Sequence, residues 1–227
     1  MGNGLLKGRV ELGGGLGIAE DPRDEAEAKA LLTENPDWLD QALTNHAAKI
    51  GYIAMSWSRM QEHLGQLFVY LVSPTSSRRG WAVWHTIVSD LTQRQMLAAV
   101  VREVYQDKKD PMRVEIEWIL RRVQAILDNR NGAIHVAFQI GVWGDGARMV
   151  PIDHTGNPRA HKMTGRDLAA DFEFTTKQIE RLGHHAKNLA PFLRPPPFQP
   201  ATGPLPQRPP APVAPQTTAK GPQGEPE

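Results

Sequence analysis

Apolar residues recur at alternating steps of three and four along most of the central part of the chain. The longest such run consists of Leu39, Leu43, His46, Ile50, Ile53, Trp57, Met60, Leu64, Leu67 and Leu71. This spacing places every member on one face of an α-helix. Asn35 followed by Pro36 is typical of a helix start, and Ser73-Pro74 is typical of an end. We therefore predict one long helix over residues 36–71.

Three shorter helices follow from the same kind of pattern. We expect the second over residues 90–105, and the third from Asp110-Pro111 to about Asn129. Thr164 followed by Asp167 resembles a capping box, and it introduces a last run formed by Leu168, Phe172, Thr175, Ile179, Leu182, Ala186, Leu189 and Leu193. Residues 78–84 are less regular, and we expect them to lead into the second helix.

Between the third and fourth helices the spacing of apolar residues changes from the helical period to a period of two. The alternating residues are Val136, Phe138, Ile140 and Val142, and Asp145-Gly146 is a turn dipeptide before Met149, Val150 and Ile152. This pattern predicts a β-hairpin or an extended flap that ends near Met163. The predicted fold class is all-α, an up-and-down four-helix bundle with this flap between helices three and four.

Composition separates this domain, residues 36–193, from two tails. Residues 1–35 are rich in glycine at their start, and we expect a flexible leader that is part-helical over residues 21–33. Twelve of the 19 prolines lie in residues 194–227, which excludes a helix or a central strand there. We expect this second tail to be disordered or polyproline-like, either as an inert linker or as a ligand for an aromatic groove.

Charge and cysteine content narrow the function classes. The net charge is +1, without the basic stripe typical of proteins that coat duplex DNA, so we expect no duplex DNA partner. The chain has no cysteine, which excludes disulfides and thiolate chemistry, and we expect neither a metal nor a cofactor. No stretch has the length and hydropathy of a membrane span, and the start lacks the pattern of a secretory signal. We expect a soluble cytoplasmic protein.

The chemically most informative stretch is Arg130-Asn131-Gly132-Ala133-Ile134-His135, at the predicted end of the third helix. Arg130 continues an apolar stripe that comprises Ile116, Ile119, Val123, Ile126 and Leu127. A guanidinium keeps its charge when it is buried, so Arg130 needs an acceptor, a partner chain or a phosphate.

Arg-x4-His near the end of the third of four helices resembles the HEPN superfamily, over roughly residues 36–193. The resemblance implies an all-helical bundle that is typically homodimeric. In active members two Arg–His pairs face each other across the dimer and form a metal-independent endoribonuclease. It therefore implies Arg130, Asn131 and His135 as catalytic residues, RNA as substrate, and a toxin, stress or defence role with an antitoxin or regulatory protein as partner.

The residue types fit this chemistry. RNA is cut when its own 2′-hydroxyl attacks the adjacent phosphate, and His135 can exchange protons with the 2′- or 5′-oxygen near neutral pH. Arg130 can hold the equatorial oxygens of the phosphorane, while Asn131 can donate to a phosphate or orient His135. The expected products are a 2′,3′-cyclic phosphate and a 5′-hydroxyl.

The alternative is a non-catalytic helical module that binds a protein or a nucleotide. Arg130 would then cap helix carbonyls or pair with Glu62, and His135 would lie beside a turn at Asn131-Gly132. The remaining candidates favour structural roles: His46 in the first helix, the histidines at 154, 161, 184 and 185, and the tryptophans at 81, 84, 118 and 143.

Overall fold

The computed structural model describes residues 8–9, 22–73, 76–152, 156–193 and 200–215. This part of the chain is mostly helical, which confirms the all-α class. The helices are α1 (Pro22–Glu34), α2 (Asp37–Val72), α3 (Ser77–Thr86), α4 (Asp90–Val104), α5 (Pro111–His135), α6 (Pro158–Met163) and α7 (Leu168–Leu189), and a 3-10 turn, η1, covers Ala190–Leu193. A strand β1 (Gly8–Arg9) precedes them, and β2 (Phe138–Trp143) and β3 (Gly146–Pro151) lie between α5 and α6.

The chain divides into two compact units that share the three longest helices. Unit 1 comprises residues 1–52, 128–173 and 215–227, and unit 2 comprises residues 53–127 and 174–214. The helices α2, α5 and α7 each begin in one unit and end in the other. Each unit has its own buried residues and is described separately.

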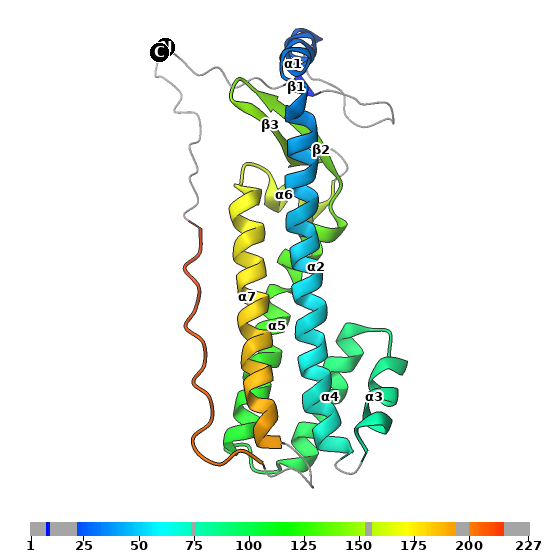
Figure 1. Ribbon diagram of the computed structural model, residues 1–227, viewed down its shortest axis with the longest axis vertical. Helices are drawn as coiled ribbons and strands as arrows, with labels where there is room; N and C mark the ends of the chain where they lie inside the picture. Colours follow the sequence, from blue (N-terminus) through cyan, green and yellow to red (C-terminus); the bar gives the residue numbers. More distant parts are fainter. Residues whose placement is uncertain (1–7, 10–21, 74–75, 153–155, 194–199, 216–227) are drawn as a thin grey trace. The chain divides into compact units, whose positions relative to one another are not determined.

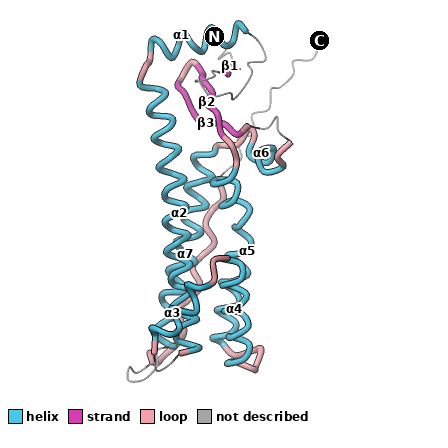
Figure 2. The backbone as a smooth tube through the Cα atoms, turned by 90° about the vertical axis from the view of Figure 1, so that its right-hand side faces the viewer, coloured by secondary structure: helices cyan, strands magenta, loops and turns pink. Residues whose placement is uncertain are grey.

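Unit 1 is built around the predicted hairpin. Strands β2 and β3 pair antiparallel from Phe138 opposite Pro151 to Trp143 opposite Gly146, as Figure 2 shows in magenta. The buried residues Ala28 and Val142 and the half-buried Trp38 join α1 and the start of α2 to this sheet. The hairpin prediction is therefore confirmed, and β1 adds a short strand on β2 within the expected leader.

Unit 2 is a helical core. Its fully buried residues come from α2, α3, α4, α5 and α7, and the largest include Ile53, Met60, Leu64, Leu67, Trp84, Leu97, Ile116, Ile119, Ile179 and Leu189. The three-and-four run of α2 is thus buried from Ile53 to Leu67 in unit 2, whereas Leu43 in unit 1 is exposed. Polar contacts join the same helices: Trp57 Nε1 donates to Asp90 Oδ2 at 2.7 Å and Ser56 Oγ to Glu180 Oε1 at 3.1 Å.

The prediction of an irregular stretch before the second helix is wrong, because residues 77–86 form helix α3. Two glycines allow this short helix to pack closely. A Cβ on Gly65 of α2 would lie 2.6 Å from a ring atom of Trp81, and one on Gly80 would lie 3.0 Å from Val69. The tryptophans of α3 therefore pack over a glycine that periodicity alone does not single out.

The third helix is longer than predicted, and this changes the setting of the Arg–His motif. Helix α5 continues to His135, and the Val136 N–H donates to the Gly132 carbonyl at 3.2 Å. The expected turn at Asn131-Gly132 is wrong, because Gly132 is buried and its missing side chain gives room to the sulfur of Met163. A contact with α6 thus outweighs the low helix propensity of glycine.

Two further expectations between the hairpin and α7 need correction. The flap does not extend to Met163, because Asn157 caps the short helix α6 by accepting a hydrogen bond from the Arg159 N–H. Thr164 does not begin the last helix, because its hydroxyl donates to Ala160 at the end of α6. The N-cap of α7 is Asp167 alone, whose carboxylate accepts from the Ala170 N–H.

The proline-rich tail is extended where the structure describes it. Residues 200–215 form an extended segment without helix or strand (Figure 1). The Ala201 N–H donates to the Pro191 carbonyl at 2.9 Å, and Arg208 pairs with Glu115. These two contacts join the segment to η1 and to α5.

Candidate functional site

The predicted catalytic residues Arg130, Asn131 and His135 all lie in the last part of α5, within unit 1. Arg130 is half-buried, and its Nη1 donates to Asn131 Oδ1 at 3.0 Å. His135 is exposed at the last residue of the helix. Five residues along an α-helix correspond to a rotation of about 140° beyond one full turn, so the two side chains leave α5 in different directions.

This geometry limits what the motif can do. Asn131 accepts a hydrogen bond from Arg130, so it orients the arginine rather than the histidine. The resemblance implies a ribonuclease site in which two Arg130–His135 pairs face each other across a homodimer. Glu62, the alternative partner of Arg130, belongs to unit 2 and is exposed on α2.

His46 has a structural setting in unit 1. Its ring lies 4.4 Å from the ring of Phe138 and 5.6 Å from that of Phe172, measured between ring centroids. Burial lowers the pKa of His46, which favours the neutral ring at neutral pH. These ring contacts show a histidine packed between two phenylalanines in unit 1.

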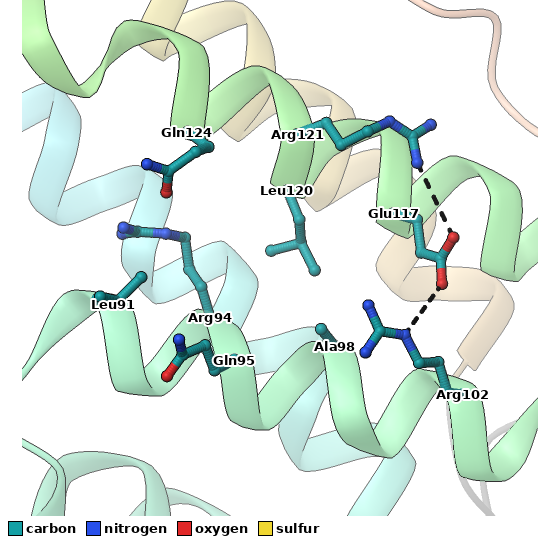
Figure 3. Close-up of a pocket in the computed structure, with 9 residues that line it drawn as sticks. All are labelled: Leu91, Arg94, Gln95, Ala98, Arg102, Glu117, Leu120, Arg121 and Gln124. Atoms are coloured by element: carbon teal, nitrogen blue, oxygen red, sulfur yellow. Dashed lines mark hydrogen bonds and ion pairs between the residues drawn. The ribbon is translucent and has the colours of Figure 1, made fainter.

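A second candidate site lies in unit 2, in a groove between α4 and α5. The groove has a volume of about 320 Å³ and is lined by Leu91, Arg94, Gln95, Ala98, Arg102, Glu117, Leu120, Arg121 and Gln124. Figure 3 shows Leu120 between two polar ends, one formed by Arg94 and Gln124 and the other by Arg102, Glu117 and Arg121. The groove therefore combines apolar side chains with three guanidinium groups.

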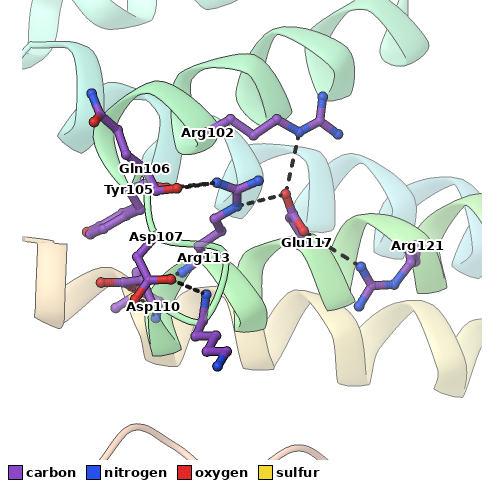
Figure 4. Close-up of polar contacts among 10 residues, drawn as sticks. Arg102, Tyr105, Gln106, Asp107, Asp110, Arg113, Glu117 and Arg121 are labelled. Carbon is purple, nitrogen blue, oxygen red and sulfur yellow. Dashed lines mark hydrogen bonds and ion pairs between the residues drawn. The ribbon is translucent and has the colours of Figure 1, made fainter.

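The charged end of the groove is organised around the carboxylate of Glu117. Arg102 Nε lies 3.4 Å and Arg113 Nε 3.2 Å from Glu117 Oε1, and Arg121 Nη1 lies 3.9 Å from Oε2 (Figure 4). Glu117 has only 25% of its side chain exposed, whereas Arg102 and Arg121 have 62% and 66% exposed. One half-buried carboxylate is thus shared by three cations, two of which reach into solvent.

Arg113 holds this arrangement in place. Its side chain is 10% exposed, and Nη1 donates to the carbonyls of Tyr105 and Gln106 at 3.0 and 3.2 Å. These carbonyls follow the end of α4, so Arg113 ties that end to the first turn of α5. Asp110 caps the same turn by accepting from the Met112 and Arg113 N–H groups. The two helix ends, and with them Arg102 and Glu117, are therefore held together.

The other end of the groove contains a buried arginine. Arg94 is 5% exposed, and its guanidinium carbon lies 5.6 Å from the centre of the Trp57 ring. Such a cation over an aromatic face is stabilised by the ring quadrupole. Arginine side chains thus lie at both ends of the groove.

Sequence reasoning missed this groove because its arginines are spread over two helices. Arg102 and Arg121 are 19 positions apart, and the domain is only mildly basic as a whole. One signal was present: Arg113, Glu117 and Arg121 follow one another at steps of four, which places them on one helix face.

The described residues contain neither a cluster of metal ligands nor a membrane-spanning helix. Within them, no three histidine, aspartate or glutamate side chains lie close enough together to hold a metal ion. No helix among them has the length and apolar character needed to cross a membrane.

Comparison with known proteins adds no assignment. No family model matches the chain, and neither a curated protein nor a solved structure is significantly similar to it. The resemblance to the HEPN superfamily stays a prediction that depends on Arg130, His135 and the helical pattern.

Proposed function

We propose that this protein is a helical binding module that takes a phosphate-bearing ligand of nucleotide size in the groove between α4 and α5. The observation that carries the proposal is the sharing of the Glu117 carboxylate by Arg102, Arg113 and Arg121, next to apolar side chains of the same groove. This is the nucleotide-binding form of the non-catalytic alternative.

The charge balance at this end of the groove favours an anion. Three guanidinium groups offer many more N–H donors than one carboxylate can accept. Arg113 uses its donors on two backbone carbonyls, but Arg102 and Arg121 are more than half exposed and reach Glu117 with one nitrogen each. Their outer N–H groups can form the paired, charge-assisted hydrogen bonds that phosphate oxygens accept.

The size and apolar side chains of the groove favour an organic anion over inorganic phosphate. Pockets for small molecules start at roughly 300 Å³ and are mostly apolar with a few polar groups. The groove, at about 320 Å³, lies at the lower end of this range, and Leu91, Ala98 and Leu120 provide its apolar contacts. Gln95 and Gln124 offer amides that both donate and accept, as recognition of a nucleobase requires.

The predicted bundle and the ribonuclease hypothesis relate to this proposal in different ways. Contacts among α2, α4, α5 and α7 in unit 2 support the four-helix bundle as the scaffold of the groove. The metal-independent endoribonuclease, its homodimer and its antitoxin stay predictions. They require Arg130 and His135 to act from two chains, whereas the groove needs one chain only.

Isothermal titration calorimetry with adenosine monophosphate, adenosine and inorganic phosphate tests the proposal on the full chain. We expect the monophosphate to bind more tightly than either fragment, because only it uses both the arginines and the apolar side chains. The double variant Arg102→Ala/Arg121→Ala should lose about tenfold or more in affinity, since two charge-assisted contacts are removed.

The matched control is Arg78→Ala/Arg79→Ala, which removes two exposed arginines from α3 in the same unit and leaves the groove intact. It should bind like the unmodified chain. Equal loss of affinity in both double variants would show that the arginines act only through net charge, and this would contradict a specific site in the groove. Absence of binding by all three ligands would contradict the proposed function.

A further inference from the structure

Arg208 of the proline-rich tail makes the most specific polar contact of that segment, within unit 2. Its Nε lies 3.0 Å from both carboxylate oxygens of Glu115, and its Nη2 lies 2.9 Å from Glu115 Oε1. An arginine that meets a carboxylate through two nitrogens forms the strongest and most directional type of ion pair. Glu115 and Arg208 are 93 positions apart, so this contact fixes the tail on α5.

An aromatic ring and a buried histidine complete the site. The guanidinium carbon of Arg208 lies 5.1 Å from the centre of the Trp118 ring, and the ring of His185 meets Trp118 edge-on at 5.5 Å. His185 Nε2 lies 3.0 Å from Glu115 Oε2, and its side chain is 1% exposed. Glu115 is therefore held from one side by α7 and from the other by the tail.

Glu115 is kept ionised by these partners. Burial alone would raise the pKa of Glu115, but the hydrogen bonds with Arg208 and His185 outweigh it and lower the pKa below the usual carboxyl value. The charge that attracts Arg208 is thus present at neutral pH.

The residues around Arg208 repeat in burial every three positions. Pro206, Pro209 and Pro212 are half-buried, while Gln207, Arg208, Pro210 and Ala211 between them are exposed. Three residues per turn is the period of the polyproline II helix. One edge of an extended, proline-rich segment therefore rests on unit 2, and Arg208 reaches its pocket from beside that edge.

We propose that Glu115, Trp118 and His185 form a recognition site for an arginine carried by a proline-rich segment, and that residues 200–214 of the chain's own tail fill it. Proline-rich segments lose little entropy on binding, because their backbone is extended before they bind. The side chain of Arg208 is still 41% exposed in the bound state, so the segment lies on the surface and can exchange with a competing segment. This inference is independent of the α4–α5 groove.

The test uses the full chain with Arg208→Ala, which empties the site, and a fluorescein-labelled peptide of residues 200–214. Fluorescence anisotropy should show saturable binding of the peptide to this variant. The unmodified chain should bind the same peptide about tenfold more weakly or not at all, because its own tail competes at high effective concentration. Saturable binding of equal strength to both chains would contradict occupation by the tail.

Two further variants distinguish recognition of the arginine from a general effect of charge or folding. Added to the Arg208→Ala chain, Glu115→Gln should reduce peptide affinity about tenfold, because it removes the acceptor charge. Glu62→Gln, which changes an exposed carboxylate on α2 in the same unit, should leave it unchanged. Circular dichroism checks that both keep their helix content.

Peptide variants test the same site on the Arg208→Ala chain without any further change to the protein. A peptide with Arg208→Ala should not bind to the emptied chain, and one with Arg208→Lys should bind more weakly than the unmodified peptide, because lysine lacks the planar fork. Equal binding of all three peptides, or no binding by the unmodified peptide, would overturn the proposal.

Discussion

Helix α5 carries two groups of charged residues, one in each unit, and the two groups differ in how their side chains are arranged around the helix. Arg130 and His135, in unit 1, are five positions apart and leave the helix about 140° apart around its axis. Arg113, Glu117 and Arg121, in unit 2, are spread over nine positions but lie at steps of four, so they share one face. The side chains of the motif that is compact in sequence therefore leave the helix in different directions, whereas those of the dispersed group lie on one face.

The two groups also differ in what surrounds them. Arg130 is paired with its sequence neighbour Asn131, and His135 is exposed. Glu117 is half-buried and receives Arg102 from another helix, beside a groove with apolar side chains. A ligand site needs side chains from several elements around a partly enclosed space. By this criterion the groove in unit 2 is the better candidate, and the predictions below test that difference.

The largest expected effect concerns the motif in unit 1. On the ribonuclease hypothesis, Arg130→Ala and His135→Ala should each lower RNA cleavage about 100-fold or more in the presence of a chelator. On the same hypothesis, the active site is shared between the two chains of a homodimer. A mixture of the two inactive variants should then regain part of the activity, measured with labelled single-stranded RNA.

The unmodified chain at the same concentration serves as the reference for this mixing experiment. Cleavage that neither variant reduces, or no cleavage by the unmodified chain, would reject catalysis by the motif. Either outcome leaves the proposed ligand site in unit 2 intact, since that site uses none of these residues.

The next effect is on the free energy of unfolding, which should differ between the buried and the exposed arginines around Glu117. Arg113→Ala should lower the free energy of unfolding by about 2–3 kcal/mol, because it leaves two backbone carbonyls and a half-buried carboxylate without their donor. Arg121→Ala should cost about 0.5 kcal/mol or less, because an exposed ion pair contributes little. Urea denaturation measures both, and equal costs would contradict the division of roles between these arginines.

Much of the fold was predictable from local pattern, because helices and hairpins follow from spacing within a short window. The run of apolar residues in α2, the start of α5 at Pro111 and the hairpin at Asp145-Gly146 are of this kind. The errors depend on contacts between distant residues. Gly132 stays helical because Met163 packs against it, and α3 forms because Gly65 makes room for Trp81.

The candidate sites show the same limit more strongly. A motif of six residues is visible in the sequence, but the direction of its side chains depends on whether the helix continues through it. The groove requires Arg102 of α4 to meet Glu117 of α5, and the tail site requires Arg208 to meet Glu115. No local pattern contains such pairings, and without related sequences to compare they follow only from the packed structure.

The smallest expected effect is a loss of stability at acid pH. One histidine in each unit should contribute to it. The pKa of His46 is lowered from 6.5 by burial. That of His63 is lowered from 6.5 by burial and by the nearby charges of Lys187, His184 and Arg59, against which Glu62 acts. The unfolded chain therefore takes up protons more readily, and the free energy of unfolding should fall as the pH drops below 6.5.

Urea denaturation at about pH 7.5 and about pH 5.5 measures this loss of stability. His63→Asn should reduce the loss contributed by unit 2, and His46→Phe should reduce the loss contributed by unit 1, because each removes a titrating ring. Unfolding free energies that rise on acidification, or a loss that neither variant reduces, would contradict these assignments.

The most direct test of the central claim compares the two regions of α5 in one titration. Backbone amide chemical shifts of the full chain are recorded while adenosine monophosphate is added. The account predicts saturable shifts of Ala98, Leu120 and Gln124 in unit 2, with residues 130–135 in unit 1 unchanged. Saturable shifts confined to residues 130–135 would contradict it and transfer the ligand site to the Arg–His motif.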